Sequence, residues 1–305
     1  MFQASQYELL DFGAGRKLEQ FGPLILDRPA PAAADIQRAK PELWSDATAR
    51  FELDAGGKSQ IGMRRGRWIT SLSLPVPWTI RHHEIHFELK ITPFGHVGVF
   101  PEQATNWDWL GNQARQGTSA SGPARLRVLN LFAYTGGSTL AAAAAGAEVT
   151  HVDAARNIVA WARRNAELSG LSAAPIRWIV DDALKFARRE LKRGKRYDAV
   201  ILDPPSYGHG SAGESWKLDD HLAELLTVCR ELAGPQPRFV LLTCHAPDYD
   251  AQRLAECLVT AGFVERAEQI QAGDLSLCTA DDRSLPAGKF ARIASIRPQP
   301  DSRYR

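Results

Sequence analysis

Two apolar segments of this sequence end in residues that suit a nucleoside ligand. The run "VLNLFAYT" leads into the paired glycines Gly136 and Gly137, and the run "EVTHVD" ends in Asp153. In an open parallel sheet, ligands bind beyond the carboxyl ends of the strands, where a glycine turn admits the ligand and an acid holds the ribose. The dinucleotide fingerprint G-x-G-x-x-G is absent from "AYTGGSTLA", so no pyrophosphate cradle is indicated. The sequence therefore predicts a nucleoside cofactor without phosphates.

A second group of reactive side chains follows two later apolar runs. The segment "DAVILDPPSYG" places Asp203 after a strand, and its two prolines fix the backbone so that the carboxylate points into the cleft. The segment "RFVLLTCHAP" places Cys244 and His245 just past another strand, on the same rim. A thiol becomes a nucleophile once it is ionised, whereas a cysteine that ends a core strand is often only a small buried apolar group. Both roles of Cys244 stay open at this point.

The elements that must position these side chains alternate between strand and helix after residue 100. Parallel strands need crossover helices between them, so this alternation predicts an α/β fold with a mostly parallel, doubly wound sheet over residues 96–305. The predicted strands are "RVLNLFA", "EVTHVD", "PIRWIVDD", "YDAVILDPP" and "RFVLLTCHAP", and the predicted helices are "STLAAAAAGA", "ARNIVAWARRNAELSGL" and "ALKFARRELKRGK".

Residues 1–95 have a different pattern. Short β-branched or alternating runs are separated there by Gly, Pro and Asp, as in "FGPLILDRP", "ARFELD", "WITSLSLP" and "IHFELKITP". Such spacing is typical of hairpins, and "APAAADIQRAKPELWSD" is predicted to be a loop with a helical turn. We therefore expect a small β-rich N-terminal domain that takes part in substrate recognition.

The composition of the 305-residue chain excludes several classes of protein. The first twenty residues lack the apolar core of a signal peptide. No segment of the sequence has the run of about 18 uncharged apolar residues that a membrane span needs. We therefore expect a cytoplasmic protein without membrane partners. The four cysteines form no C-x-x-C pair, which predicts neither a metal site nor a disulfide framework. A net charge of +2 gives no global nucleic-acid signature, so RNA binding would need local patches.

The segments after residue 100 resemble motifs I to IV of the class I S-adenosylmethionine-dependent methyltransferases. The resemblance is carried by "NLFAYTGGSTLAAAAAGAEVTHVDAARNIVAWARRNAELSGL", "IVDDALKF" and "DAVILDPPSYG", and it extends over residues 97–293. These segments are most similar to the bacterial large-subunit ribosomal RNA 5-methylcytosine methyltransferases and their relatives. The resemblance implies a Rossmann-like class I methyltransferase sheet and S-adenosyl-L-methionine as the cofactor.

The resemblance also implies which residues bind each part of the cofactor. Asp153 would bind the ribose, since a carboxylate can accept from both hydroxyls of a diol, although it would also suit a cap of the following helix. Asp182 would accept from the adenine amine, with Asp181 as a competitor, and one of these two acids would only cap a helix. The turn that approaches the methionine part, where a positive-φ position would favour glycine, consists of Phe132, Ala133, Tyr134, Thr135 and Gly136.

Three residues receive roles on the acceptor side. Asp203 would lie beside the transferred methyl group of the cofactor and position the acceptor base or take up its proton, with a turn cap as the alternative. Tyr207 would stack on a flipped base or close the cleft. Cys244 matches the cysteine that adds to C6 of the base in the 5-methylcytosine family, and His245 or a nearby arginine would lower its pKa.

The N-terminal region departs from the family pattern. No RNA-binding PUA domain is recognisable in residues 1–95, and "VFPEQATNW" replaces the family's leucine-aspartate-glutamine-arginine stretch, which leaves Gln103 without a basic neighbour. Two segments interleave cationic and aromatic residues, a pattern that suits phosphate contacts with base stacking and equally a hairpin with solvated charges. Their residues are Arg64, Arg65, Arg67, Trp68, Trp78, Arg81, His82 and His83.

Taken together, the motifs predict an S-adenosylmethionine-dependent methyltransferase that acts on RNA, with cytosine C5 of ribosomal RNA as the favoured target. Two alternatives are methylation of a nitrogen and of a non-nucleic-acid substrate, both with Asp203 and Tyr207 active and Cys244 inert. A non-catalytic cofactor- and RNA-binding module is a third alternative, and the missing third glycine disfavours a dehydrogenase. The sequence predicts no oligomeric state.

Overall fold

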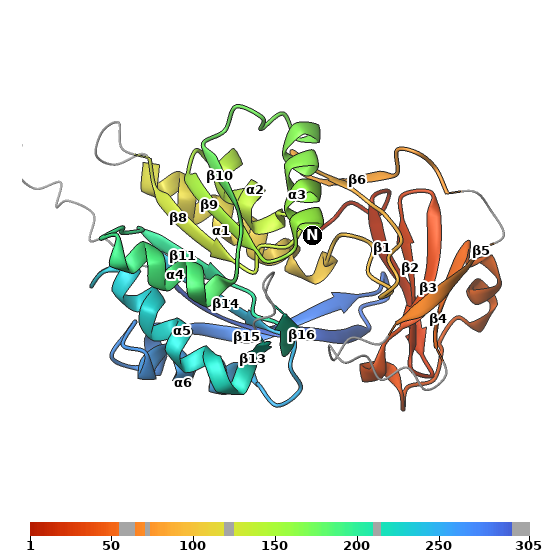
Figure 1. Cartoon of the computed structure of the whole chain (residues 1–305). Coiled ribbons are helices and arrows are strands. Elements are labelled where there is room, and N and C mark those ends of the chain that lie inside the picture. The colour runs from red at the N-terminus through yellow and green to blue at the C-terminus, as the bar shows by residue number, and fades with distance from the viewer. Residues whose placement is uncertain (55–64, 71–73, 119–124, 210–214, 295–305) are drawn as a thin grey trace, which may run out of the picture.

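The computed structural model describes residues 1–54, 65–70, 74–118, 125–209 and 215–294, and its largest element is a seven-stranded sheet (Figure 1). The strand order is β10-β9-β8-β11-β14-β16-β15. Neighbouring strands are parallel except in the two pairs that β16 makes, with β14 and with β15. This order confirms the predicted α/β fold with a mostly parallel sheet. The strands are β8 (Arg127–Leu131), β9 (Glu148–Asp153), β10 (Ile176–Val180), β11 (Ala199–Leu202), β14 (Phe239–Cys244), β15 (Gln271–Cys278) and β16 (Ser284–Ala294).

Helices cover both faces of the sheet, as a doubly wound fold requires (Figure 1). The strand order reverses between β8 and β11, so a ligand crevice is expected at the carboxyl ends of these two strands. One face carries α1 (Ala104–Thr118), α2 (Gly137–Ala144) and α3 (Arg156–Leu168), and the other carries α4 (Ala183–Lys192), α5 (Leu218–Ala233) and α6 (Ala251–Thr260). In the part of the chain that the structure describes, no helix is long and apolar enough for a bilayer crossing.

The predicted strands and helices of this region are all present, and the alanine tract is the clearest case. The side chains of Ala141, Ala142 and Ala143 are buried in α2, and their small size lets the helix lie close to its neighbours. The sequence did not predict α1, α5 and α6, nor the antiparallel pair β15 and β16.

The N-terminal region forms a separate five-stranded sheet, which confirms the predicted β-rich region (Figure 1). Its pairs are antiparallel except for β3 with β4. The connection after β3 contains the predicted helical turns as 3₁₀ segments at Pro31–Ala33 and Pro41–Asp46. The strands are β1 (Tyr7–Gly13), β2 (Arg16–Phe21), β3 (Leu24–Pro29), β4 (Ala49–Leu53) and β5 (Gly66–Thr70), followed by the hairpin β6 (Thr79–His82) and β7 (Ile85–Glu88).

The two sheets share one hydrophobic core. A single cluster of buried side chains extends from Phe21 in β2 through Phe87 in β7 to Leu140 in α2. The ring of Phe87 stacks on Trp107 of α1 at a centroid distance of 5.0 Å. Apolar packing crosses the domain boundary predicted at residue 95. The division of the chain into two domains at this residue therefore stays a prediction.

A buried carboxylate joins the N-terminal sheet to the far edge of the large sheet. Asp11 of β1 is 0% exposed and accepts hydrogen bonds from the Trp44 indole (2.9 Å) and the backbone N–H of Lys40 (3.0 Å). Arg283, in the turn between β15 and β16, donates to the same carboxylate at 2.5 Å. Burial opposes ionisation of Asp11, yet these hydrogen bonds hold its pKa below the ordinary value of 3.8.

We predict that Arg283→Met lowers the free energy of unfolding by about 2 kcal/mol at pH 7, because it removes a charge-assisted hydrogen bond from a buried carboxylate. Because the pKa of Asp11 is lower in the folded protein than its ordinary value of 3.8, the ionised carboxylate stabilises the fold above pH 3.8. This stabilisation is lost as the pH falls through the lowered pKa of the folded state. The difference between the wild type and the variant should therefore narrow in acid. Urea unfolding at pH 7 and pH 3 measures both values, with the exposed Arg125→Met as the control. Equal stabilities at pH 7 would contradict this role of Arg283.

Candidate active site

A cavity of about 40 Å³ lies at the carboxyl ends of β8, β11 and β14, where the strand order reverses. Its lining joins the predicted cofactor turn to the predicted catalytic acid. Phe132 and Tyr134 come from the turn after β8, Asp203 follows β11, and Thr243 lies in β14. The cavity therefore brings together two motifs that are about seventy residues apart in the sequence and that the strand-end rule predicts to meet.

The turn after β8 has an unusual backbone. Phe132 (φ 56°) and Tyr134 (φ 49°) adopt the left-handed region without being glycine, and Gly136 follows at φ 94°. Non-glycine residues in this region cost about 1–3 kcal/mol each and cluster at functional sites. The Thr135 hydroxyl donates to the Gly98 carbonyl at 2.6 Å, which ties the turn to the chain before α1. These features fit the predicted close approach of a cofactor to the backbone of residues 132–136.

Asp153 ends β9 and lies against the same turn. One carboxylate oxygen accepts from the Tyr134 N–H at 2.9 Å and the other from the Ala155 N–H at 3.0 Å. The N-cap residue of α3 is Ala155, with no side-chain cap, so Asp153 orders the approach to the helix but does not cap its first turn. Burial raises the pKa of Asp153, and the two backbone N–H groups oppose this rise. The carboxylate keeps free lone pairs, as its predicted contact with a ribose diol requires.

Of the two acids after β10, Asp182 is the helix cap. It is the N-cap residue of α4, and its side chain accepts from the Lys185 N–H at 2.8 Å. Asp181 accepts from the Asp182 N–H at 3.0 Å and pairs with Arg189. Neither acid lines the cavity, so the proposed contact with the adenine amine still rests on the resemblance.

Asp203 has the contacts of an oriented acid. The Thr243 hydroxyl donates to its Oδ1 at 2.5 Å, and the Nε2 atom of His245 lies 3.7 Å from the same oxygen. The Nδ1 atom of His245 is 2.7 Å from the Ala287 carbonyl, which can only accept, so Nδ1 carries a proton. Burial opposes protonation of His245, but the charges of Asp203 and Glu102 hold its pKa above 6.5. The imidazole of His245 therefore pairs with Asp203.

Tyr207 follows Asp203 by four residues and does not belong to the cavity lining. It begins the short strand β12 (Tyr207–His209), which pairs with β13 (Ser215–Lys217), and its side chain is 38% exposed. The ammonium of Lys217 lies 5.9 Å from the centre of its ring. Both predicted roles of Tyr207, stacking on a base and closing the cleft, are compatible with this position.

Cys244 does not have the lowered pKa that a nucleophilic thiol needs. Its side chain is 1% exposed, and burial raises its pKa to about 11, with a further rise from the charge of Asp203. The sulfur accepts from the Ala246 N–H at 3.4 Å. A thiol with this pKa is protonated at neutral pH. A hydrogen bond from the His245 backbone lowers the pKa of Cys244 but does not offset the effect of burial, so the predicted net lowering does not occur. The structure agrees with the alternative of a small buried apolar group.

The sequence did not single out His96 and Phe100, which line or support the same cleft. The two rings pack edge to face at 5.2 Å. Arg28 of β3 donates to the Gly95 carbonyl at 3.1 Å, so the N-terminal sheet contacts the segment that leads to Phe100. Burial, together with the charges of Arg28 and Lys17, lowers the pKa of His96 to about 4. No sequence motif marks these residues, because chain segments far apart in sequence bring them together.

Several candidates for RNA contacts have other roles. Trp78 is 3% exposed and donates to the Phe21 carbonyl, so it is not available for base stacking. Trp68 is partly buried and donates to the Thr92 carbonyl at 2.8 Å. Arg67 and Arg81 are exposed, which keeps them as candidates for phosphate contacts, whereas Arg64 lies outside the described residues.

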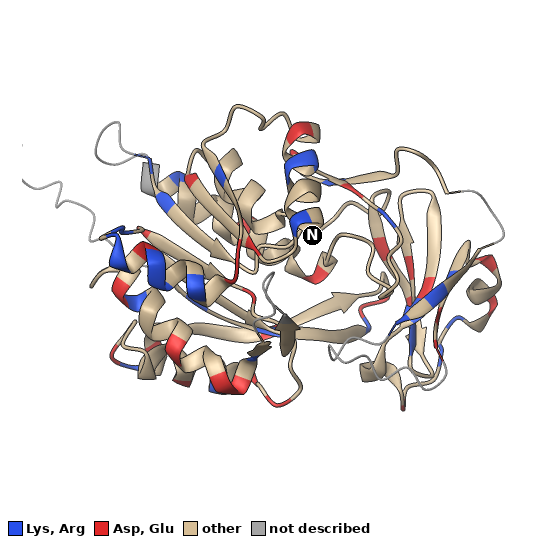
Figure 2. Cartoon of the chain, viewed as in Figure 1, with Lys and Arg blue, Asp and Glu red and all other residues tan. Residues whose placement is uncertain are grey.

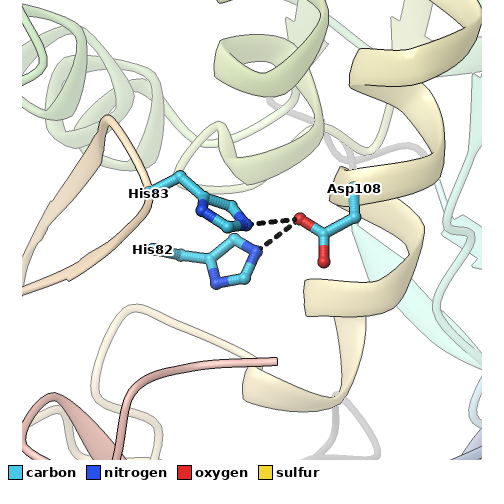
Figure 3. Close-up of side chains that lie close together, drawn as sticks. All are labelled: His82, His83 and Asp108. Carbon is cyan, nitrogen blue, oxygen red and sulfur yellow. Dashed lines mark hydrogen bonds and ion pairs between the residues drawn. The ribbon is translucent and has the colours of Figure 1, made fainter.

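His82 and His83 converge on an acid of α1 (Figure 3). Their Nε2 atoms lie 2.7 Å and 3.1 Å from the same Oδ1 atom of Asp108. His82 is buried, which lowers its pKa and keeps it neutral. These three groups have the chemistry of metal ligands, but hydrogen bonds account for their arrangement, and they tie the β6–β7 hairpin to α1.

Lys and Arg side chains gather on α4, while α5 carries several acidic residues (Figure 2). The run from Arg188 to Arg196 forms the end of α4 and the following loop, and most of it is exposed. Arg188 pairs with Glu224 of α5, and Arg193 pairs with Glu190 at 3.1 Å. This segment is a solvated helix face and loop.

Comparisons with known proteins agree with this site. A family model described as S-adenosylmethionine-dependent methyltransferase matches residues 62–272. The crystal structure of an S-adenosylmethionine-dependent methyltransferase from Agrobacterium tumefaciens has a TM-score of 0.83 and 38% identity, over 95% of this chain and 90% of that chain. The matched range of the family model includes the turn after β8, Asp153 and Asp203.

Two relatives are ribosomal RNA large subunit methyltransferase I proteins. The protein from Klebsiella pneumoniae is 38% identical over 280 residues, which is 84% of this chain and 65% of that protein. The protein from Aeromonas salmonicida is 27% identical over 302 residues, and the match covers 93% of this chain and 71% of that protein. Because the family model and the Agrobacterium structure each cover more than half of the chain, this protein belongs to the S-adenosylmethionine-dependent methyltransferases.

Proposed function

We propose that this methyltransferase modifies a base in RNA and that the acceptor enters the cleft beside Asp203 and Tyr207. The proposal is supported by relatives that are named for the large subunit of ribosomal RNA and by the oriented carboxylate of Asp203 at the cavity. The cofactor supplies an electrophilic methyl group on a sulfonium. An RNA acceptor accords with the expected cytoplasmic location.

The residues of the chain would divide the work between binding and proton transfer. The turn at residues 132–136 and Asp153 hold the cofactor, while Asp181, the acid after β10 that does not cap α4, accepts from its adenine amine. Asp203, fixed by Thr243, accepts a hydrogen bond from the group that is methylated. The neighbouring imidazole of His245, when protonated, balances the negative charge of Asp203. Tyr207 packs against the base at the rim. Alignment of the acceptor atom with the methyl group is the main contribution of such a site.

The state of Cys244 favours a nitrogen acceptor over cytosine C5. Attack on C6 of a base needs a thiolate, and the buried thiol has a pKa of about 11. A ring or exocyclic nitrogen instead attacks the methyl carbon with its own electrons: the nitrogen–carbon bond forms, the sulfur–carbon bond breaks, and any proton that leaves the nitrogen passes by way of Asp203 to solvent. This route uses Asp203 and leaves Cys244 without a chemical role.

We therefore predict that Cys244→Ala retains methyl transfer within about twofold of the wild type, because removal of an unreactive thiol changes no step of the reaction. In a strain that lacks the gene, mass mapping of ribosomal RNA should show a missing methyl group. Both the wild type and Cys244→Ala should restore that group.

The 5-methylcytosine mechanism makes the opposite prediction. Loss of product in Cys244→Ala with unchanged cofactor affinity, together with a covalent adduct on RNA that contains 5-fluorocytosine, would establish the thiol as a nucleophile. If the methylation map of ribosomal RNA were unchanged in the strain that lacks the gene, the proposal of a ribosomal substrate would be wrong.

A further inference from the structure

His82 and His83 direct their rings toward one carboxylate, that of Asp108 in α1 (Figure 3). The Nε2 atoms of the two imidazoles lie 2.7 Å and 3.1 Å from its Oδ1 atom. Among the residues that the structure describes, this is the one group of three histidine, cysteine or acidic side chains whose ligand atoms all lie within 4.8 Å of one another. Two imidazole nitrogens and a carboxylate oxygen form a donor set that suits zinc and related divalent ions.

The spacing of the three atoms is close to that of ligands around one ion. Zinc binds imidazole nitrogen and carboxylate oxygen at about 2.0–2.1 Å, so two of its ligand atoms lie about 2.9–3.4 Å apart at bond angles between a right angle and the tetrahedral angle. The contacts of 2.7 Å and 3.1 Å therefore need only small side-chain movements to admit an ion. The amino group of Met1 lies 3.6 Å from the other carboxylate oxygen of Asp108, Oδ2, which leaves Oδ1 for the ion.

The backbone of the β6–β7 hairpin makes the two histidines converge. Consecutive side chains of a strand point to opposite faces, but His83 follows β6 with φ 50°, in the left-handed region. Its ring consequently lies beside that of His82, with the centroids 4.4 Å apart. The pairing of His82 with Ile85 leaves a two-residue loop that begins with His83, and such loops favour glycine or asparagine at a positive-φ position. Histidine is tolerated there and brings a second imidazole to the carboxylate.

The group combines one fixed ligand with an open side. The ring of His82 is 2% exposed and packs against the rings of Phe2 and Trp107, at centroid distances of 4.9 Å and 5.9 Å. The side chains of His83 and Asp108 are 69% and 35% exposed. An ion can therefore enter from solvent and keep water in its remaining coordination position, as zinc does where three protein side chains bind it.

We propose that His82, His83 and Asp108 bind a divalent transition-metal ion of the zinc type through the two Nε2 atoms and Oδ1. The ion connects the β6–β7 hairpin to α1 and adds to the hydrogen bond that already joins them. None of the three residues lines the cavity, so the ion has a structural role, whatever substrate accepts the methyl group. The cysteine spacing does not show this site, because no cysteine takes part and His82 and Asp108 are 26 residues apart.

Titration calorimetry with ZnCl₂ on the full chain, without a histidine tag, tests the site. The wild type should bind Zn²⁺ at one site. Asp108→Asn replaces the carboxylate by an amide oxygen that still accepts a hydrogen bond from His82, and it should weaken Zn²⁺ binding at least about tenfold. His83→Asn, at an exposed side chain where asparagine tolerates the left-handed backbone, should weaken it at least as much.

The matched control is His86→Ala, in β7 of the same hairpin but outside this group, which should bind Zn²⁺ as the wild type does. Zn²⁺ should raise the Tm of the wild type and of His86→Ala but not that of His83→Asn, while the wild type and His83→Asn should unfold at the same temperature in EDTA. A wild type that binds no Zn²⁺, or that binds it no more tightly than both ligand variants do, would overturn the proposal.

Electron paramagnetic resonance of the Cu²⁺ complex identifies the ligands directly. The spectrum should show hyperfine coupling to two imidazole nitrogens in the wild type and to one in His83→Asn. The same coupling in both proteins would place the ion elsewhere on the chain, and the assignment to these three residues would then be wrong.

Discussion

Asp203→Ala should slow methyl transfer about 10²–10⁴-fold while the affinity for S-adenosylmethionine changes by less than tenfold. Positioned acid–base groups contribute rate factors of this size, and the Asp203 carboxylate is fixed by Thr243 and His245 at the mouth of the cavity. Its side chain is 31% exposed, so solvent can replace most of its contact with the bound cofactor. An interaction made mainly in the transition state affects turnover far more than binding.

Radiolabelled methyl transfer and calorimetry on the same preparation separate the two effects. Asp248→Ala is the matched control, because Asp248 is an exposed acid in the loop that follows β14 and does not line the cavity. If Asp203→Ala turned over at the wild-type rate, the acid would only stabilise the turn after β11. If the variant lost cofactor binding and turnover to the same extent, Asp203 would belong to the cofactor site alone.

Asp153→Ala should weaken S-adenosylmethionine by about 1.5–3 kcal/mol, or roughly tenfold to more than a hundredfold, because two charge-assisted hydrogen bonds to the ribose are lost. The loss extends to the turn itself, since Asp153 also holds the Tyr134 N–H. Burial raises the pKa of this carboxyl, so wild-type affinity should fall as the pH drops through that pKa. Asp153→Asn should bind weakly at all pH values.

Calorimetry at several pH values checks this prediction, and 5′-methylthioadenosine serves as a second ligand because it retains the ribose. Both ligands should lose affinity in Asp153→Ala. Unchanged affinity in the variant, or tight binding of NADH in place of S-adenosylmethionine, would remove Asp153 from the ribose site.

The parts of the fold that follow from local pattern could be predicted from the sequence. The apolar strands before Gly136 and before Asp203 are buried on both faces, and their hydrophobic runs are therefore continuous. The amphipathic spacing of residues 156–168 marks α3 in the same way. Because parallel strands end at one edge of a sheet, the strand order places Asp153, the glycine turn and Asp203 at the same edge.

Other features depend on contacts that no local pattern records. The sequence could not show that Cys244 is buried, because strand ends lie either in the core or at the cleft. Nε2 of Gln103 has no hydrogen-bond partner among the described residues, because Arg292, from the last strand, orients Asn106 so that it donates to the other end of the amide. Trp78 has the composition of a stacking residue, yet it packs in the core that joins the two sheets. Such roles are set by tertiary contacts between distant segments.

The transfer of a tritiated methyl group from S-adenosylmethionine to RNA tests the central claim most directly. The full chain, incubated with labelled cofactor and with RNA from a strain that lacks its gene, should give ribonuclease-sensitive label with the wild type and with Cys244→Ala, and almost none with Asp203→Ala. A wild-type protein that binds the cofactor but leaves that RNA unlabelled would contradict the claim that this methyltransferase acts on RNA.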